Sequence, residues 1–295
     1  MVTDSSARPQ SLLSAEQLTR TFGSFTAVSD VNFTVEPGEV VGLLGANGAG
    51  KTTVIRMLIG LLVPSAGRAL LLDKEPSLEV RRHLGYVPQS MGLYTDLTVA
   101  ENVSFSAQAF GVAPAQLRPP LDGLADRLVA DLSLGLQRQL AFVIALQHRP
   151  DVLVLDEPTS GVGPLSRAHL WDTIREQADN GTGVLITTHY MAEASECDRL
   201  LLMFQGKLIA QGSERDVVGD TSAIEVETDS WAAAFEALVN ADQPVTLFGR
   251  GVRVADSRPD AVQNILAAAG VEARLTEVPA TLEERMASLA SRGTL

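Results

Sequence analysis

The sequence has a single cysteine, Cys197, and no apolar run near the roughly 18 residues that cross a bilayer. One thiol excludes an intramolecular disulfide and suits a reducing compartment. The best candidate run, Leu140 to Leu146, is seven residues long, and residues 1–10 lack the apolar core of a secretory signal. These absences predict a soluble, cytoplasmic protein.

Basic residues are also scarce, because 23 lysines and arginines stand against 36 acidic residues, which gives a formal net charge of −13. A protein that binds nucleic-acid backbones needs a basic stripe, so no nucleic-acid partner is expected. A single nucleotide is compatible with this charge, since backbone N–H groups and one lysine can bind its phosphates locally.

Residues 12–212 carry short apolar runs that lack the alternation of half-exposed strands, with helix-like stretches between them. This strand–helix–strand order predicts an α/β domain with a largely parallel sheet and helices outside it. The expected strands are 40–44, 152–155, 184–187 and 200–204, the expected helices are 52–62, 136–147 and 164–179, and an antiparallel strand is expected over 27–35.

The composition shifts after Gly219, and residues 223–295 are poor in glycine. Their pattern predicts a small α+β domain. The expected order is strand 223–227, helix 231–239, a hairpin around 249–251, helix 259–269, strand 273–278 and helix 282–290. The chain is therefore expected to comprise a flexible tail (1–11), a main domain (12–219) and an accessory domain (220–295).

A phosphate-binding loop is indicated where the strand over 40–44 gives way to a helix. Its glycines would let the backbone wrap phosphate groups, Lys51 would reach the β and γ oxygens, and the Thr52 hydroxyl could bind Mg²⁺. The alternative, a glycine turn beside a surface lysine, is disfavoured by the flanking strand and helix. The loop comprises Gly45, Ala46, Asn47, Gly48, Ala49, Gly50, Lys51 and Thr52.

Two acids, Asp156 and Glu157, end the apolar run that starts at Val152. Asp156 is placed to hold Mg²⁺, directly or through water. Glu157 is placed to orient or deprotonate an attacking water. Acids also end buried strands simply to meet solvent, but a phosphate loop in the same chain favours the catalytic interpretation.

Further motifs follow in a characteristic order, and together they resemble the ATP-binding subunit of an ATP-binding cassette (ABC) transporter over roughly residues 12–215. The resemblance implies ATP and Mg²⁺ as ligands. It also implies a P-loop NTPase fold with an antiparallel β subdomain, a shortened α-helical subdomain and a small C-terminal α+β domain. Besides the phosphate loop, the motifs are Gly85–Gln89, Leu132–Leu136, Leu155–Gly161 and Thr187–His189.

The resemblance also assigns residue roles. Phe22 stands where the family stacks an aromatic ring on adenine, although a core position is the plain alternative. Gln89 would contact the metal and sense the membrane partner, and His189 would touch the γ-phosphate and brace Glu157. The implied catalytic set is Lys51, Glu157 and His189, the implied metal ligands are Thr52, Gln89 and Asp156, and further nucleotide contacts are implied for Thr53, Ser133 and Gly135.

The signature segment departs from the family's usual L-S-G-G-Q, because Leu134 and Leu136 replace a glycine and the glutamine. Ser133 and Gly135 remain, and in the family they contact the nucleotide of a second subunit. One chain therefore implies a head-to-tail dimer, with a second copy or with another ABC ATPase. Gly163 also stands where aspartate is usual, and residues 111–132 are about one helix shorter than usual in the family.

The leading hypothesis is an ATPase subunit resembling multidrug and daunorubicin-resistance exporter ATPases, at the inner face of the membrane with separate transmembrane permease subunits. Residues 279–286 resemble the accessory domain of those exporters, whose last helix is thought to steady the dimer; a packed tail is the alternative. A low-activity regulatory subunit, motivated by Leu134, Leu136 and Gly163, is the second hypothesis. A soluble ABC protein of translation or DNA repair is the third, and the acidic charge opposes it.

Overall fold

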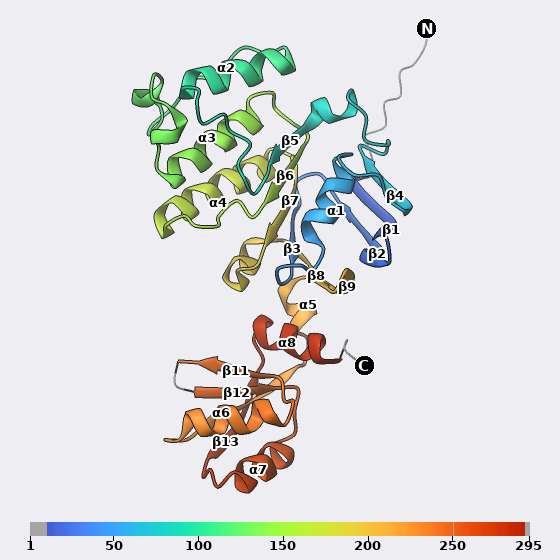
Figure 1. Ribbon diagram of the computed structural model, residues 1–295, viewed down its shortest axis with the longest axis vertical. Coiled ribbons are helices and arrows are strands. Elements are labelled where there is room, and N and C mark those ends of the chain that lie inside the picture. Colours follow the sequence, from blue (N-terminus) through green and yellow to red (C-terminus); the bar gives the residue numbers. More distant parts are fainter. Residues whose placement is uncertain (1–10, 250, 293–295) are drawn as a thin grey trace. The chain divides into compact units, whose positions relative to one another are not determined.

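The computed structural model describes residues 11–249 and 251–292, which fall into two compact units with the division between Leu208 and Ile209 (Figure 1). The predicted tail over 1–11 lies outside the described residues except for Ser11, which is buried. The division precedes the domain boundary expected at Gly219, so that α5 (Glu214–Val218) belongs to the second unit.

A six-stranded sheet has the strand order β5-β6-β7-β3-β8-β9, and all its strands except β9 lie wholly in the first unit. The pairs between β5 and β8 along this order are parallel, as the sequence predicts. Every residue of β3 and β6 is buried, which explains their uninterrupted apolar sequence. The strands are β5 (Leu84–Val87), β6 (Val152–Asp156), β7 (Gly183–Thr188), β3 (Val40–Leu44), β8 (Arg199–Phe204) and β9 (Lys207–Gly212).

A second, antiparallel sheet has the order β2-β1-β4. It comprises β1 (Leu13–Phe22), β2 (Phe25–Val35) and β4 (Ala66–Leu71). Helix α1 (Lys51–Leu58) contacts strands of both sheets, and its buried Val54, Ile55 and Leu58 join their common apolar core. The start of α1 is therefore fixed at the junction of the two sheets (Figure 1).

Two helix boundaries in the first unit differ from the prediction by more than one residue. Helix α1 ends at Leu58 rather than at Leu62, because Gly60 takes the left-handed φ of +72° and turns the chain. Helix α3 (Leu134–Leu146) begins two residues before the expected Leu136, with Ser133 as its N-cap residue. Helix α4 (Pro164–Asp179) has the predicted bounds, and its first residue is a proline, whose fixed φ suits that position.

Helices α2 (Val99–Phe110) and α3 pack against each other, and α3 also packs against β5 (Figure 1). Thr98 and Glu101 form a reciprocal capping box at the start of α2, and Gly111 ends this helix in the left-handed conformation. Two single 3₁₀ turns, Asp122–Leu124 and Val129–Asp131, span the segment before α3. The shared core of this region consists of Val99, Val103, Leu121, Val129, Leu132 and Leu140.

The second unit holds the predicted order of strands and helices on an antiparallel sheet, β11-β12-β10-β13. Ile224, Val254 and Leu266 are among its fully buried core residues. The elements are β10 (Ser222–Glu227), α6 (Trp231–Asn240), β11 (Val245–Phe248), β12 (Gly251–Ala255), α7 (Pro259–Ala268), β13 (Arg274–Pro279) and α8 (Leu282–Arg292).

A buried ion pair joins α8 to the sheet of the second unit. The Nε of Arg253 lies 2.9 Å from Oε1 of Glu284, whose side chain is only 3% exposed. Arg253 also donates to the carbonyl of Pro279 at 2.8 Å, and Glu284 accepts from the backbone N–H of Thr281 at 2.7 Å. The segment 279–286, whose family resemblance is noted above, therefore contains the contacts that cap α8 and attach it to the sheet.

Within the part of the chain that the structure describes, no helix combines the length and the apolar character needed to traverse a bilayer.

Cys197 is half-buried beside Gly42, and burial raises the pKa of its thiol to about 12. This thiol therefore stays uncharged at neutral pH and packs as a small apolar side chain against the core.

Candidate functional site

The glycine-rich loop lies between β3 and α1, and its glycines permit a tight path. Gly48 and Gly50 have left-handed φ values of +83° and +104°. A Cβ atom at Gly50 would lie 2.7 Å from the carbonyl oxygen of Ala27, and one at Gly45 would lie 2.5 Å from that of Met203. Larger residues would displace the loop at either position.

Lys51 occupies the centre of this loop and is only 5% exposed. Its Nζ donates to the carbonyl oxygens of Gly45 at 2.6 Å and Ala46 at 3.3 Å. Burial lowers the pKa of Lys51, and the negative charges of Glu157 and Asp156 oppose that shift. The loop thus holds an ammonium group where phosphate oxygens would be bound.

Asp156, at the end of β6, is 2% exposed and is held in place by a residue of the neighbouring strand β7. Its Oδ1 accepts a hydrogen bond from Thr187 Oγ1 at 2.6 Å and lies 3.5 Å from Thr52 Oγ1. A carboxylate beside a hydroxyl is the kind of oxygen donor set that Mg²⁺ prefers, so these two residues fit the predicted metal. Sequence reasoning assigned no role to the side chain of Thr187.

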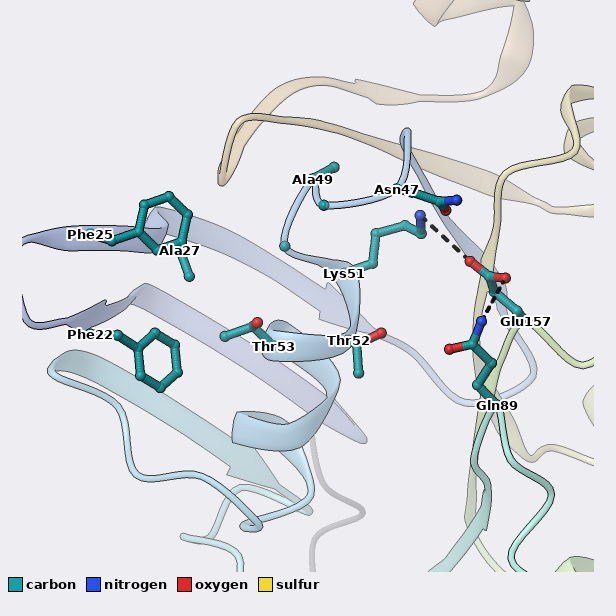
Figure 2. Close-up of a pocket in the computed structure, with 12 residues that line it drawn as sticks. Phe22, Phe25, Ala27, Asn47, Ala49, Lys51, Thr52, Thr53, Gln89 and Glu157 are labelled. Carbon is teal, nitrogen blue, oxygen red and sulfur yellow. Dashed lines mark hydrogen bonds and ion pairs between the residues drawn. The ribbon is translucent and has the colours of Figure 1, made fainter.

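The carboxylate of Glu157 is the point where three predicted site residues meet. Its Oε1 lies 3.8 Å from Lys51 Nζ, and its Oε2 lies 3.3 Å from Gln89 Nε2 (Figure 2). The same Oε2 also lies 3.3 Å from His189 Nδ1. The backbone of Glu157 has a left-handed φ of +50°, held by its N–H bond to Thr187 Oγ1 at 2.9 Å. Such a conformation costs about 1–3 kcal/mol and is characteristic of functional positions.

A cavity of 510 Å³ runs from the loop to an aromatic end (Figure 2). Figure 2 shows the rings of Phe22 and Phe25 at that end, and Lys51, Gln89 and Glu157 at the other. Phe22 is 46% exposed, so it is no core residue. The lining residues are Phe22, Phe25, Ala27, Asn47, Gly48, Ala49, Gly50, Lys51, Thr52, Thr53, Gln89 and Glu157.

Phe25 is a lining residue that sequence reasoning missed. It pairs directly with Phe22 across the turn between β1 and β2, which contains Gly23 in the left-handed conformation. The sequence signal was present, because two phenylalanines separated by a two-residue glycine turn face each other in a hairpin. Arg20 stacks its guanidinium on Phe22, with 4.6 Å between Cζ and the ring centroid.

Ser133 and Gly135 do not line this cavity. They lie at the N-terminal end of α3, where the Ser133 side chain is exposed and makes no capping hydrogen bond. A Cβ atom at Gly135 would lie 2.9 Å from Ser166 Oγ on α4, so a larger residue there would require the Ser166 side chain to turn away. The structure of one chain therefore separates these two predicted contacts from the others.

Arg138, on α3, is a second buried cation near the acids and was not expected from the sequence. It is 4% exposed, and its Nε and Nη1 have no hydrogen-bond partner among the described residues. Burial lowers its pKa, and the charges of Glu157 and Asp156 oppose that shift. An unsatisfied buried guanidinium of this kind favours an anionic ligand nearby.

Replacing Phe25 with alanine is expected to weaken nucleotide binding about tenfold, since stacking of a base on an aromatic ring contributes roughly 1–3 kcal/mol. Equilibrium binding of a fluorescent ATP analogue measures this change. Phe248→Ala is the matched control, because Phe248 is also exposed (69%) but belongs to the second unit. Equal affinities of the two variants would show that Phe25 does not contact the base.

A glycine-rich loop between a buried strand and a helix, with an Asp–Glu pair ending a parallel strand of the same sheet, defines the site of a P-loop nucleoside triphosphatase. The family described as "ABC transporter" matches residues 28–160. A "Nod factor export ATP-binding protein I" from Paraburkholderia xenovorans is 38% identical over 74% of this chain and 76% of its own length. The chain belongs to this family of ATP-binding ABC transporter proteins, whose members are ATPases.

Another relative is named "Probable multidrug ABC transporter ATP-binding protein YbhF", from Escherichia coli K12, and is 40% identical over 78% of this chain. The match spans 42% of that relative's length. Among solved structures, an ATP-binding subunit of an ABC transporter has a TM-score of 0.65 at 30% identity and covers 70% of this chain and 91% of its own. A nucleotide-free ATP-binding cassette has a TM-score of 0.59 at 26% identity and covers 69% of this chain and 91% of its own.

Proposed function

We propose that this chain binds and hydrolyses ATP to power a multidrug-type exporter whose membrane-spanning subunits are separate chains. The observation that carries the proposal is the Glu157 carboxylate, which contacts Lys51, Gln89 and His189 beside the phosphate loop. Two relatives are named for multidrug transport and for Nod factor export, which supports an export role. The chain would work at the inner face of the cell membrane.

In this proposal, each side chain in and around the cavity has a separate role in binding or hydrolysing ATP. Phe22 and Phe25 hold the base, and the loop N–H groups with Lys51 hold the phosphates. Glu157 accepts a proton from the attacking water while His189 keeps that carboxylate in place. Mg²⁺, held by Thr52, Asp156 and Gln89, would supply positive charge to the phosphate oxygens.

A second copy of the chain, arranged head to tail, would complete each site in this proposal. Ser133 is exposed at the start of α3, a helix of 13 residues whose N-terminal N–H groups attract anions. The hydroxyl of Ser133 and the backbone of Gly135 would then meet a phosphate bound by the other chain. Residues 12–219 form the ATP-binding domain in this proposal, and residues 220–295 form the accessory domain.

A mixing experiment tests both the chemistry and the dimer. Glu157→Gln removes the base and Ser133→Arg blocks the signature, so each variant alone should be inactive. A 1:1 mixture should recover about one quarter of the wild-type rate, because half of the dimers are mixed and each has one intact site. The measurement is Mg²⁺-dependent phosphate release. A mixture as inactive as its components, beside an active wild type, contradicts the head-to-tail homodimer.

The regulatory alternative is favoured by one observation. The side chain of Leu134 is 40% exposed and packs against Gly161 in the loop between β6 and α4. A bulky apolar group there lies beside the residues proposed to face the second chain. ATP binding without Glu157-dependent turnover at any protein concentration would support a regulatory subunit, whereas turnover rising faster than linearly with concentration would exclude it.

A further inference from the structure

His189 is supported on a second side by the next residue, Tyr190. Their ring centroids lie 4.2 Å apart with 35° between the planes. Tyr190 is itself fixed at its backbone, where its N–H donates to Thr188 Oγ1 at 2.9 Å. The imidazole therefore contacts both the carboxylate of Glu157, 3.3 Å away, and the ring of Tyr190.

Helix α4 contributes a cation to this arrangement. Cζ of Arg167 lies 5.0 Å from the ring centroid of Tyr190, within the range of a cation–π interaction. The same guanidinium places its Nε 3.6 Å from Oε1 of Glu193. Arg167 stands in the first turn of α4, where its N–H donates to the carbonyl of Gly163 at 3.0 Å.

Glu193 is a buried carboxylate that neither the sequence nor the proposed chemistry uses. Its side chain is 3% exposed, and neither carboxylate oxygen has a hydrogen-bond partner among the described residues. A buried carboxylate is costly unless a cation compensates it, and Arg167 is close enough to do so. Glu193 lies in the 3₁₀ turn Met191–Glu196, directly after Tyr190, so it ties Arg167 to the segment that carries His189.

We infer that Arg167 is a positioning residue for His189, anchored by Glu193 and acting through the ring of Tyr190. The inference rests on the proposed ATPase function, in which His189 braces Glu157. The guanidinium lies over the ring of Tyr190, and Tyr190 limits the rotation of the imidazole beside it. This arrangement links the start of α4, next to Gly163, to the catalytic carboxylate through side chains.

The test uses the full-length chain and three variants of α4. Arg167→Ala should lower kcat for ATP about tenfold with KM unchanged, because a displaced catalytic group loses rate rather than ground-state binding. Arg167→Lys keeps a cation and should restore most of that loss. Arg175→Ala is the matched control, since Arg175 is on the same helix and pairs with Asp198 at 3.0 Å. In a His189→Ala background, Arg167→Ala should cause no further loss.

Imidazole NMR gives a second readout that does not need turnover. The His189 signal, assigned by its absence in His189→Ala, should move in Arg167→Ala and stay in place in Arg175→Ala. An unmoved signal in Arg167→Ala overturns the inference, as does an additive effect of the two substitutions on kcat. If the wild-type chain shows no Glu157-dependent turnover, the proposed function fails, and the NMR comparison alone then decides on Arg167.

Discussion

Glu157→Gln is expected to lower ATP turnover by about 10²–10⁴-fold, the usual contribution of a general base. Glutamine has nearly the same shape but cannot accept the proton from water. The substitution also removes a negative charge 3.8 Å from Lys51 Nζ, so phosphate binding should be retained or strengthened. Initial rates of phosphate release and equilibrium binding of labelled ATP measure the two effects separately.

The matched control for this prediction is Glu176→Gln, at an exposed glutamate of α4. It should change neither the rate nor the affinity. Turnover of Glu157→Gln at the level of Glu176→Gln would mean that another group accepts the proton, and the role given to the Glu157 carboxylate would have to be abandoned.

Glu284→Ala is expected to destabilise the second unit by about 3–5 kcal/mol, the typical cost of removing one partner from a buried ion pair. The substitution leaves Arg253, which is only 9% exposed, without its carboxylate. It also removes the acceptor for the N–H of Thr281 at the start of α8. The last helix should detach from the sheet at lower denaturant concentration.

Tryptophan fluorescence can report this loss, because the chain has two tryptophans, and Trp231 lies in the second unit. Urea unfolding in a Trp171→Phe background follows Trp231 alone. Replacing both Arg253 and Glu284 with methionine should restore much of the stability, since apolar side chains of similar volume can replace a buried pair. A cost below about 1 kcal/mol for Glu284→Ala would place this pair among surface-like interactions.

The elements that the sequence predicts best are those whose local signals agree with their surroundings. Strand β3 is apolar throughout because both faces of the central sheet are covered, and α4 begins at a proline that suits a first helical turn. The end of α1 was misplaced by the apolar residues that follow Gly60, because the left-handed turn at that glycine decides the boundary. A stop signal therefore outweighs continued hydrophobicity.

The site residues that belong to a local sequence motif were predictable, whereas those brought together from distant segments were not. The roles of Lys51 and Glu157 follow from local patterns, and their separation of 3.8 Å agrees with a shared site. The electrostatic interaction of Arg138 with the acids, and the cation–π contact of Arg167 with Tyr190, join helices to segments far away in the sequence. No spacing rule along the chain encodes such contacts, because packing of the folded helices creates them.

The hydrogen bonds of Lys51 affect how the loss of activity in a Lys51 variant should be interpreted. Its ammonium group donates hydrogen bonds to the carbonyls of Gly45 and Ala46, so it stabilises the shape of the loop in addition to its proposed role in phosphate binding. A neutral side chain at position 51 would remove these hydrogen bonds and leave the two carbonyl groups to find other donors. An inactive Lys51 variant would thus report on a reshaped loop, whereas Glu157→Gln is expected to remove the proposed base and leave the hydrogen bonds of Lys51 in place.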